Sequence, residues 1–220
     1  MSSIYTPAHR ALQEEFDTLR LADMMEGGFT VTEFGDADRA FVESRDMFFL
    51  STIDSRGRPT VSYKGGDPGF VRVLDSKTLA FPFYDGNGMF YSWGNLANNA
   101  QVGLLFINFQ KPQRLRVQGT ASVDRNDPLL REYHEAQGIV RVAVEGMWPN
   151  CPRYVHRYEK VAHSRYVPKT ECQTPLAGWK RIDVVQDALP ATDKGRAEKE
   201  GGVLTPEEWY GKVAEGSHDA

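Results

Sequence analysis

The residues with the clearest chemical potential lie in three neighbouring segments near the middle of the chain. Residues 62–73 carry Lys64 and Arg72 among three glycines, residues 86–89 add two glycines, and residues 92–100 are rich in asparagine. Glycines let the backbone approach a flat ligand, cations attract a phosphate, and amide side chains at a helix start add neutral donors. This combination predicts a site for a phosphorylated aromatic ligand. The alternative is that the glycines only turn hairpins and that both cations are solvated.

Other catalytic patterns are missing from the sequence. It has no GxSxG elbow, no Walker loop, no HExxH pair and no strand-linked GxGxxG, which argues against hydrolases and nucleotide triphosphatases. His156 and His163 lie seven residues apart without carboxylate or cysteine partners at ligand spacing, so we expect surface histidines and no metal site. Cys151 and Cys172 are too few for a disulfide framework, and we expect both to be reduced thiols.

Composition limits the class of protein. The 220 residues are 40% hydrophobic and 25% charged, which is typical of a globular chain with one well-buried core. The formal net charge of -4 gives no general attraction to polyanions, so nucleic acid is not an expected partner. The first 20 residues contain no apolar stretch long enough for a signal or membrane helix, so we expect a cytoplasmic protein without a membrane partner.

The hydrophobic pattern predicts a sheet with a few helices. Helical spacing of apolar residues indicates helices at 7–25, 36–45 and 91–99. Apolar runs and period-2 alternation between turn residues indicate strands at 47–53, 60–63, 70–74, 78–81, 101–109, 114–123 and 139–147. Short strands joined by hairpins, with no βαβ series, favour an antiparallel barrel over a doubly wound parallel sheet.

The expected organisation has three parts. We expect N-terminal helices over residues 1–45 and a barrel domain with a C-terminal lid segment over 46–184. Residues 185–220 are polar and rich in Gly, Lys and Glu, and we interpret them as a tail. Within the tail, Thr205 before Pro206 is typical of a helix start.

The order of the motifs resembles the pyridoxamine 5'-phosphate oxidase-related family of FMN-binding split barrels. The resemblance covers about residues 48–147 and rests on GFVRV at 69–73, GNLANN at 94–99 before VGLLF, and LRVQGTA at 115–121. It implies a mainly β fold with peripheral helices, built as an antiparallel split barrel. It also implies a homodimer in which each FMN lies at the interface between two barrels.

The resemblance also implies a set of cofactor-binding positions. Phe70, Val71 and Arg72 would lie along the isoalloxazine, with Arg72 at a phosphate-binding position and Lys64 as a second candidate. Phe81 and Pro82 replace a Tyr-Thr pair of the oxidases, Tyr91 and Ser92 replace an Arg-Lys pair, and Arg114 replaces a glutamine at the flavin. The implied FMN-binding residues are Lys64, Phe70, Val71, Arg72, Phe81, Pro82, Ser92, Asn95, Arg114 and Arg116. These departures indicate a divergent member rather than a true pyridoxamine phosphate oxidase.

The implied function is an FMN-dependent oxidoreductase that acts on an unidentified small molecule, with NAD(P)H as a candidate partner. The flavin would transfer the electrons, so no catalytic side chain is assigned. Arg153, in the segment after the last strand, would belong to a lid near the flavin, and Trp179 is a weaker match to a pocket-closing residue of the oxidases. The alternatives are a flavin-binding or storage protein without turnover, and a haem-binding split barrel.

Overall fold

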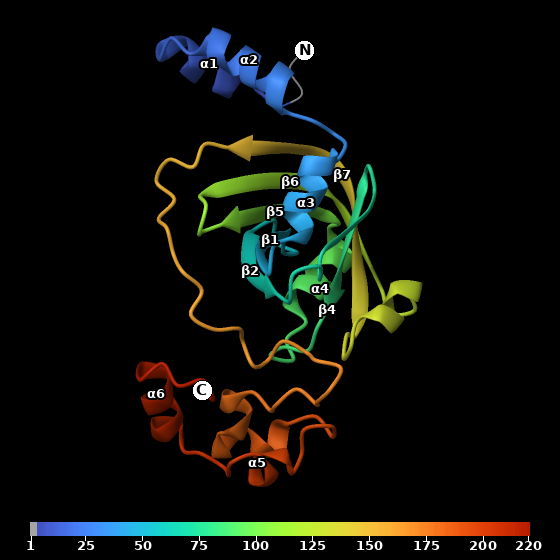
Figure 1. Ribbon diagram of the computed structural model, residues 1–220, viewed down its shortest axis with the longest axis vertical. Helices are drawn as coiled ribbons and strands as arrows, with labels where there is room; N and C mark the ends of the chain where they lie inside the picture. The colour runs from blue at the N-terminus through green and yellow to red at the C-terminus, as the bar shows by residue number, and fades with distance from the viewer. Residues whose placement is uncertain (1–3) are drawn as a thin grey trace. The chain divides into compact units, whose positions relative to one another are not determined.

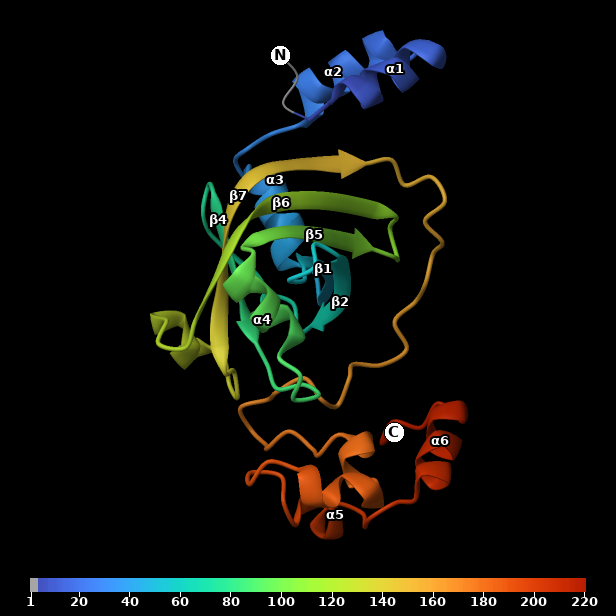
Figure 2. The same ribbon diagram turned by 180° about the vertical axis from the view of Figure 1, so that it is seen from behind.

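The structure is a computed structural model that describes residues 4–220. Its strands are β1 (Met47–Ile53), β2 (Pro59–Gly65), β3 (Arg72–Asp75), β4 (Thr78–Phe83), β5 (Gln101–Asn108), β6 (Gln113–Asp124) and β7 (Gly138–Asn150). They form one antiparallel sheet with the order β2-β1-β5-β6-β7-β4-β3. The sheet curls into a barrel that is split between its two edge strands, β2 and β3 (Figures 1 and 2). The expected antiparallel, mainly β fold is confirmed.

The interior of the barrel is apolar and rich in aromatic side chains. Phe48 of β1 lies at its centre, with ring centroids 4.9 Å from Phe81 and 5.1 Å from Phe106. All three side chains are fully buried. Burial alternates along β1 and β5, as period-2 side-chain direction requires when one face of a strand is covered. The register of these strands therefore fixes which residues form the core.

The longest pairing in the sheet joins β6 to β7 and contains one bulge. The register shifts between Gln118 and Gly119, where β7 carries one extra residue. A Cβ atom on Gly119 would lie 2.2 Å from the carbonyl oxygen of Ala143 on the paired strand. Glycine is required here because the two backbones approach too closely for any side chain.

The N-terminal part is a pair of helices rather than the single helix expected over 7–25. Helix α1 (Pro7–Glu15) ends before Asp17, which has a φ of 52°, and α2 (Leu19–Phe29) begins after it. The expected end at residue 25 is also wrong, because α2 runs on through Gly27 and Gly28 to Phe29. Apolar periodicity continues across both helices, so the periodicity alone did not reveal the left-handed residue that separates them.

Helices α3 (Asp36–Glu43) and α4 (Tyr91–Asn98) follow the predictions over 36–45 and 91–99. The short 3-10 helix η1 (Pro128–Glu132) was not predicted. Contacts group residues Met1–Glu159 into one compact unit and Lys160–Ala220 into a second. The expected boundary between residues 184 and 185 therefore falls inside the second unit.

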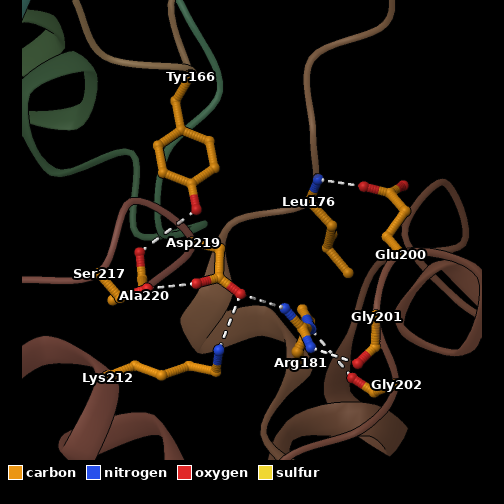
Figure 3. Close-up of polar contacts among 10 residues, drawn as sticks. All are labelled: Tyr166, Leu176, Arg181, Glu200, Gly201, Gly202, Lys212, Ser217, Asp219 and Ala220. Atoms are coloured by element: carbon orange, nitrogen blue, oxygen red, sulfur yellow. Dashed lines mark hydrogen bonds and ion pairs between the residues drawn. The ribbon is translucent and has the colours of Figure 1, made fainter. Parts of the chain in front are cut away.

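The second unit contains η2 (Gly178–Arg181), η3 (Asp183–Ala188), α5 (Arg196–Lys199) and α6 (Pro206–Ala214). Arg181 is 5% exposed and donates to the carbonyl oxygens of Gly201 and Gly202 and to Asp219 (Figure 3). Lys180 forms a buried ion pair with Asp193, with Nζ 2.8 Å from Oδ2. Residues after 185 thus supply partners for the two buried cations of this unit, Lys180 and Arg181. The polar composition of this segment does not by itself reveal these contacts.

We expect Gly119→Ala to destabilise the protein by about 1–3 kcal/mol, because the new methyl group overlaps a backbone carbonyl that cannot move freely. The matched control is Gly103→Ala in the adjacent strand, where the nearest atom to an added Cβ is Ser51 Cβ at 3.7 Å. Urea unfolding at one protein concentration measures both. Equal midpoints for the two variants would contradict the close approach at the bulge.

We expect Asp193→Ala to unfold the second unit locally, because it leaves Lys180 buried without its carboxylate, a loss of about 3–5 kcal/mol. Limited proteolysis followed by mass spectrometry should show faster cleavage within residues 160–220. The double variant Lys180→Met/Asp193→Ala should recover part of the resistance, since it removes the unpaired charge. A single variant as resistant as the parent chain would disprove this role for the pair.

Candidate functional site

A polar cluster connects α4 to the β1–β2 hairpin. On β2, Thr60, Ser62 and Lys64 are half-buried, whereas the alternate residues Val61 and Tyr63 are exposed. The hydroxyl oxygens of Ser62 and Ser92 lie 3.3 Å apart, and Asn95 Nδ2 donates to Thr52 Oγ1 at 3.0 Å. Ser92 and Asn95, both predicted from the sequence, therefore lie on the face of α4 that contacts this hairpin.

The hairpin turn is held by Asp54, which is 7% exposed. Its carboxylate accepts from the backbone N–H groups of Arg56 and Arg58, both at 2.9 Å, and from Arg58 Nε at 2.8 Å. These bonds, chiefly the one from the Arg58 side chain, lower the pKa of Asp54 to about 2. The Tyr91 hydroxyl lies 3.5 Å from Asp54 Oδ2, so the first residue of α4 also contacts this carboxylate.

Lys64 stands beside an aromatic group at the start of α4. Its Nζ lies 5.3 Å from the ring centroid of Phe83, which packs edge-on against Trp93 at 4.8 Å and stacks with Phe90 at 6.1 Å. Burial lowers the pKa of Lys64. Among residues 4–220 no carboxylate pairs with this ammonium group, and the contact that the structure shows for it is the face of the Phe83 ring.

A half-buried cation without a carboxylate partner is suited to bind an anion. Lys64 and Ser62 lie on the same side of β2, because their positions differ by two, and Ser62 contacts Ser92 in the first turn of α4. The N-terminus of a helix carries partial positive charge, which also favours an anion. We call Ser62, Lys64, Ser92 and the rings of Phe83, Phe90 and Trp93 the Lys64 group.

Four other predicted residues are buried. Phe70, Val71 and Phe81 are no more than 6% exposed and belong to the hydrophobic core. Phe70 stacks on Phe48 with centroids 5.9 Å apart. Pro82 is also buried, but it follows Phe81 along β4 and therefore points to the opposite face of the strand.

Arg72 lies at the opposite edge of the sheet from Lys64. It starts β3, pairs with Glu132, and its guanidinium carbon lies 5.0 Å from the ring centroid of Tyr133. The bond to Glu132 is the main reason that the pKa of Arg72 is raised. Unlike Lys64, Arg72 already has a carboxylate partner, so a phosphate would have to compete with Glu132 for it.

Arg114 and Arg116 lie on the outer face of β6. Arg114 Nε donates to the carbonyl oxygen of Cys151 at 3.1 Å, and Arg116 is exposed opposite Leu105 and Trp148. Residues that pair directly across neighbouring strands lie on the same face of a sheet. Lys64 pairs with Phe48, whereas Arg116 pairs with Leu105, which in turn pairs with Phe49, the neighbour of Phe48 along β1. The register therefore places Lys64 and Arg116 on opposite faces of the sheet.

The lid and pocket-closing candidates lie in different units. Arg153 follows β7 and is exposed, with its guanidinium 5.9 Å from the Tyr154 ring. Trp179 lies in η2 of the second unit, where the ammonium of Lys180 is 5.8 Å from its ring. Among residues 4–220, no group of three or more metal-ligating side chains is found.

The sequence analysis missed Ser62, Phe83 and Phe90 as members of this group. The signal for Ser62 was present, since period-2 alternation along β2 puts it on the same side as Lys64. The two phenylalanines carry no such signal, because their meeting depends on how the segment between β4 and α4 folds back. Trp93 is partly buried and packs edge-on against Phe83.

Comparison with known proteins identifies the family. The pyridoxamine 5'-phosphate oxidase profile matches residues 34–151, which is 118 of the 220 residues. The chain therefore belongs to the pyridoxamine 5'-phosphate oxidase family, as the motifs indicated, and its fold is the split barrel of that family. A search of curated proteins finds no significant match. No helix within residues 4–220 is long and apolar enough to cross a membrane.

Solved structures with similar folds share little sequence with this chain. HupZ from Group A Streptococcus is 13% identical with a TM-score of 0.44, covering 57% of this chain and 100% of its own. An FMN-binding protein from Syntrophomonas wolfei is 10% identical with a TM-score of 0.41, covering 64% and 96%. General Stress Protein 26 from Bacillus anthracis is 12% identical with a TM-score of 0.37, covering 50% and 87%. The family assignment rests on the sequence profile alone.

We expect Asp54→Asn to remove a pH-dependent part of the stability. The pKa of Asp54 is about 2 in the folded protein, below its ordinary value of 3.8. The ionised carboxylate therefore stabilises the fold above about pH 4, and this contribution is lost as the pH falls toward 2. Urea midpoints measured from pH 5 to pH 2 should therefore fall less steeply in the variant than in the parent chain. Identical slopes would show that Asp54 does not hold this turn through its charge.

Proposed function

We propose that this protein binds FMN and acts as an FMN-dependent oxidoreductase on a small molecule. The observation that carries the proposal is Lys64, a half-buried ammonium group without a carboxylate partner among residues 4–220. It lies on the same side of β2 as Ser62, whose hydroxyl contacts that of Ser92 at the start of α4. Membership of the pyridoxamine 5'-phosphate oxidase family supports a flavin as the ligand. Among the residues predicted from the sequence, Lys64 fits the phosphate better than Arg72, which already pairs with Glu132.

The donor set fits a phosphate monoester. A lysine ammonium has three donors and each serine hydroxyl has one, so Lys64, Ser62 and Ser92 together match the acceptor oxygens of a phosphate. Binding would also restore a counter-charge to Lys64, whose burial currently disfavours its charged form. Ser92 stands where the oxidases of the family carry one of two adjacent cations, so this chain would rely on a lysine from β2 instead.

The chemistry of the reaction would come from the flavin, which transfers electrons between two substrates when bound. The residues of this chain would hold the phosphate, orient the ring and limit the access of water. Phe83, Phe90 and Trp93 provide an apolar surface next to the phosphate donors, and Phe90 is 47% exposed and available to a ligand. We further propose a homodimer in the cytoplasm, as the family resemblance implies, with NAD(P)H as the candidate electron donor.

We expect Lys64→Met to lower the affinity for FMN by about ten- to a hundredfold. A charge-assisted hydrogen bond contributes about 1.5–3 kcal/mol, and each 1.4 kcal/mol is a factor of ten in affinity. Riboflavin, which lacks the phosphate, should bind the variant and the parent chain equally. Fluorescence titration with both ligands provides the measurement, and Arg72→Met is the matched control, which should retain its FMN affinity.

The contrary outcomes of this experiment are distinct. If Arg72→Met loses FMN selectively, the phosphate lies at β3 and the assignment to Lys64 is wrong. If the parent chain binds riboflavin as tightly as FMN, there is no phosphate site. An absorption spectrum of the purified protein with a Soret band would point to haem, and bound FMN that NADH and NADPH fail to reduce would favour flavin binding without turnover.

A further inference from the structure

The helix pair α1–α2 exposes large apolar side chains that its own chain does not cover. Ala22 is the only buried residue that α1 and α2 contain, although both helices are described over their full length. The uncovered side chains are exposed by 40–69% and are Leu12, Phe16, Leu21, Met24, Met25 and Phe29. Contiguous exposed apolar surface of this kind usually marks an interaction site.

The helix pair is held in a defined shape and attached to the barrel at one point. Arg10 of α1 bonds Asp23 of α2 at 2.6 Å and lies 3.6 Å from Glu26. Just after α2, Val31 exchanges two backbone hydrogen bonds with Met147 of β7, at 2.9 and 2.8 Å. The pair is therefore a preformed unit, and its apolar residues are not exposed merely because the segment lacks structure.

A second uncovered surface lies on the outer face of the sheet. The register aligns Tyr63, Phe49, Leu105, Arg116 and Trp148 in one row across five strands, while their neighbours along the strands point into the core. Tyr63 is 62% exposed. The next row contains Gly103 and Gly146, which have no side chains, so the surface beside the aromatic row is shallow. We call these two rows the outer sheet face.

The two surfaces carry opposite charges. Residues 5–33, which include the helix pair, contain six carboxylates against two arginines. The β5–β6 hairpin, residues 101–124, contains Lys111, Arg114 and Arg116 against one carboxylate, Asp124 at its end. Opposite charge favours contact between a helix pair and a β5–β6 hairpin, whereas two helix pairs would repel each other.

We propose that the α1–α2 pair of one copy of this chain packs on the outer sheet face of a second copy. The contact would cover Leu12 and Phe16 with the aromatic row and bring Glu15, which flanks them on α1, toward Lys111 and the two arginines. This proposal rests on the proposed homodimer and adds the surfaces that form it. An anionic membrane is a poorer occupant, because helices that lie on such membranes carry basic polar faces and this pair is acidic.

A zero-length carbodiimide cross-link between copies tests the contact directly. Equal amounts of unlabelled and ¹⁵N-labelled protein are mixed, allowed to exchange and treated with the carbodiimide, which joins carboxylates to lysines that touch. We expect Glu15, located by fragmentation of the cross-linked peptide, to be joined to Lys111, with light–heavy pairs as frequent as random mixing predicts. Such cross-links found only within one isotope, or not at all, would overturn the proposal.

A paired substitution separates this contact from the flavin site. We expect Leu12→Ser/Phe16→Ser to weaken dimerisation at least tenfold by light scattering across a dilution series, with the far-ultraviolet circular dichroism unchanged. The control is Val161→Ser, which removes an apolar side chain that is 98% exposed and lies outside both surfaces, and it should leave the dimer intact. A paired variant that dimerises like the parent chain would overturn the contact, even if FMN still binds.

Two further results of the same experiments are informative. A parent chain that is monomeric at micromolar concentration would overturn both the homodimer and this contact, while FMN titration would still report on the Lys64 group by itself. Co-sedimentation of the parent chain, but not the paired variant, with phosphatidylcholine and phosphatidylserine vesicles would assign the helix pair to a membrane surface instead.

Discussion

The register between β1, β5, β6 and β7 is the constraint on which the other features of this protein depend. Because side chains alternate along a strand, a shift of one residue would exchange the core face for the outer face. The observed register buries Phe48, Phe81 and Phe106 against one another and leaves Arg116 outside. The bulge at Gly119 fixes this register in the longest pairing, since β6 and β7 approach there more closely than a side chain permits.

The same alternation separates two kinds of chemistry on the two faces of one strand. On one side of β2, the Ser62 hydroxyl contacts Ser92 of α4, and the ammonium group of Lys64 lies beside the Phe83 ring. Tyr63 points the other way, into the aromatic row of the outer face. A ligand site and a protein contact can therefore coexist on neighbouring residues without competing for the same side chains.

Burial has different consequences for the two cations that the sequence singled out. Arg72 keeps its charge by pairing with Glu132, which raises its pKa, whereas Lys64 is partly desolvated without such a partner, which lowers its pKa. A surface cation that pairs with a carboxylate adds little to the stability of the fold and already has a counter-ion. A half-buried cation without such a partner lacks a counter-ion. The α1–α2 helix pair and the second unit both lie outside the family match at residues 34–151.

The sequence by itself determined the strands, the family and most polar residues of the candidate site, because alternation, turn residues and ordered motifs are local properties. It predicted β1 over its full extent and placed Lys64, Ser92 and Asn95 among the site residues. Tertiary structure alone decided that Glu132 pairs with Arg72, that Phe70 and Phe81 face the core, and that Asp17 divides the N-terminal helix. Each of these features depends either on contacts between residues distant in sequence or on one backbone angle. Such contacts and angles do not change the spacing of apolar residues along the chain, so the sequence pattern does not reveal them. The buried Lys180–Asp193 pair has the same origin, since a polar segment shows its charges in the sequence but not which of them meet.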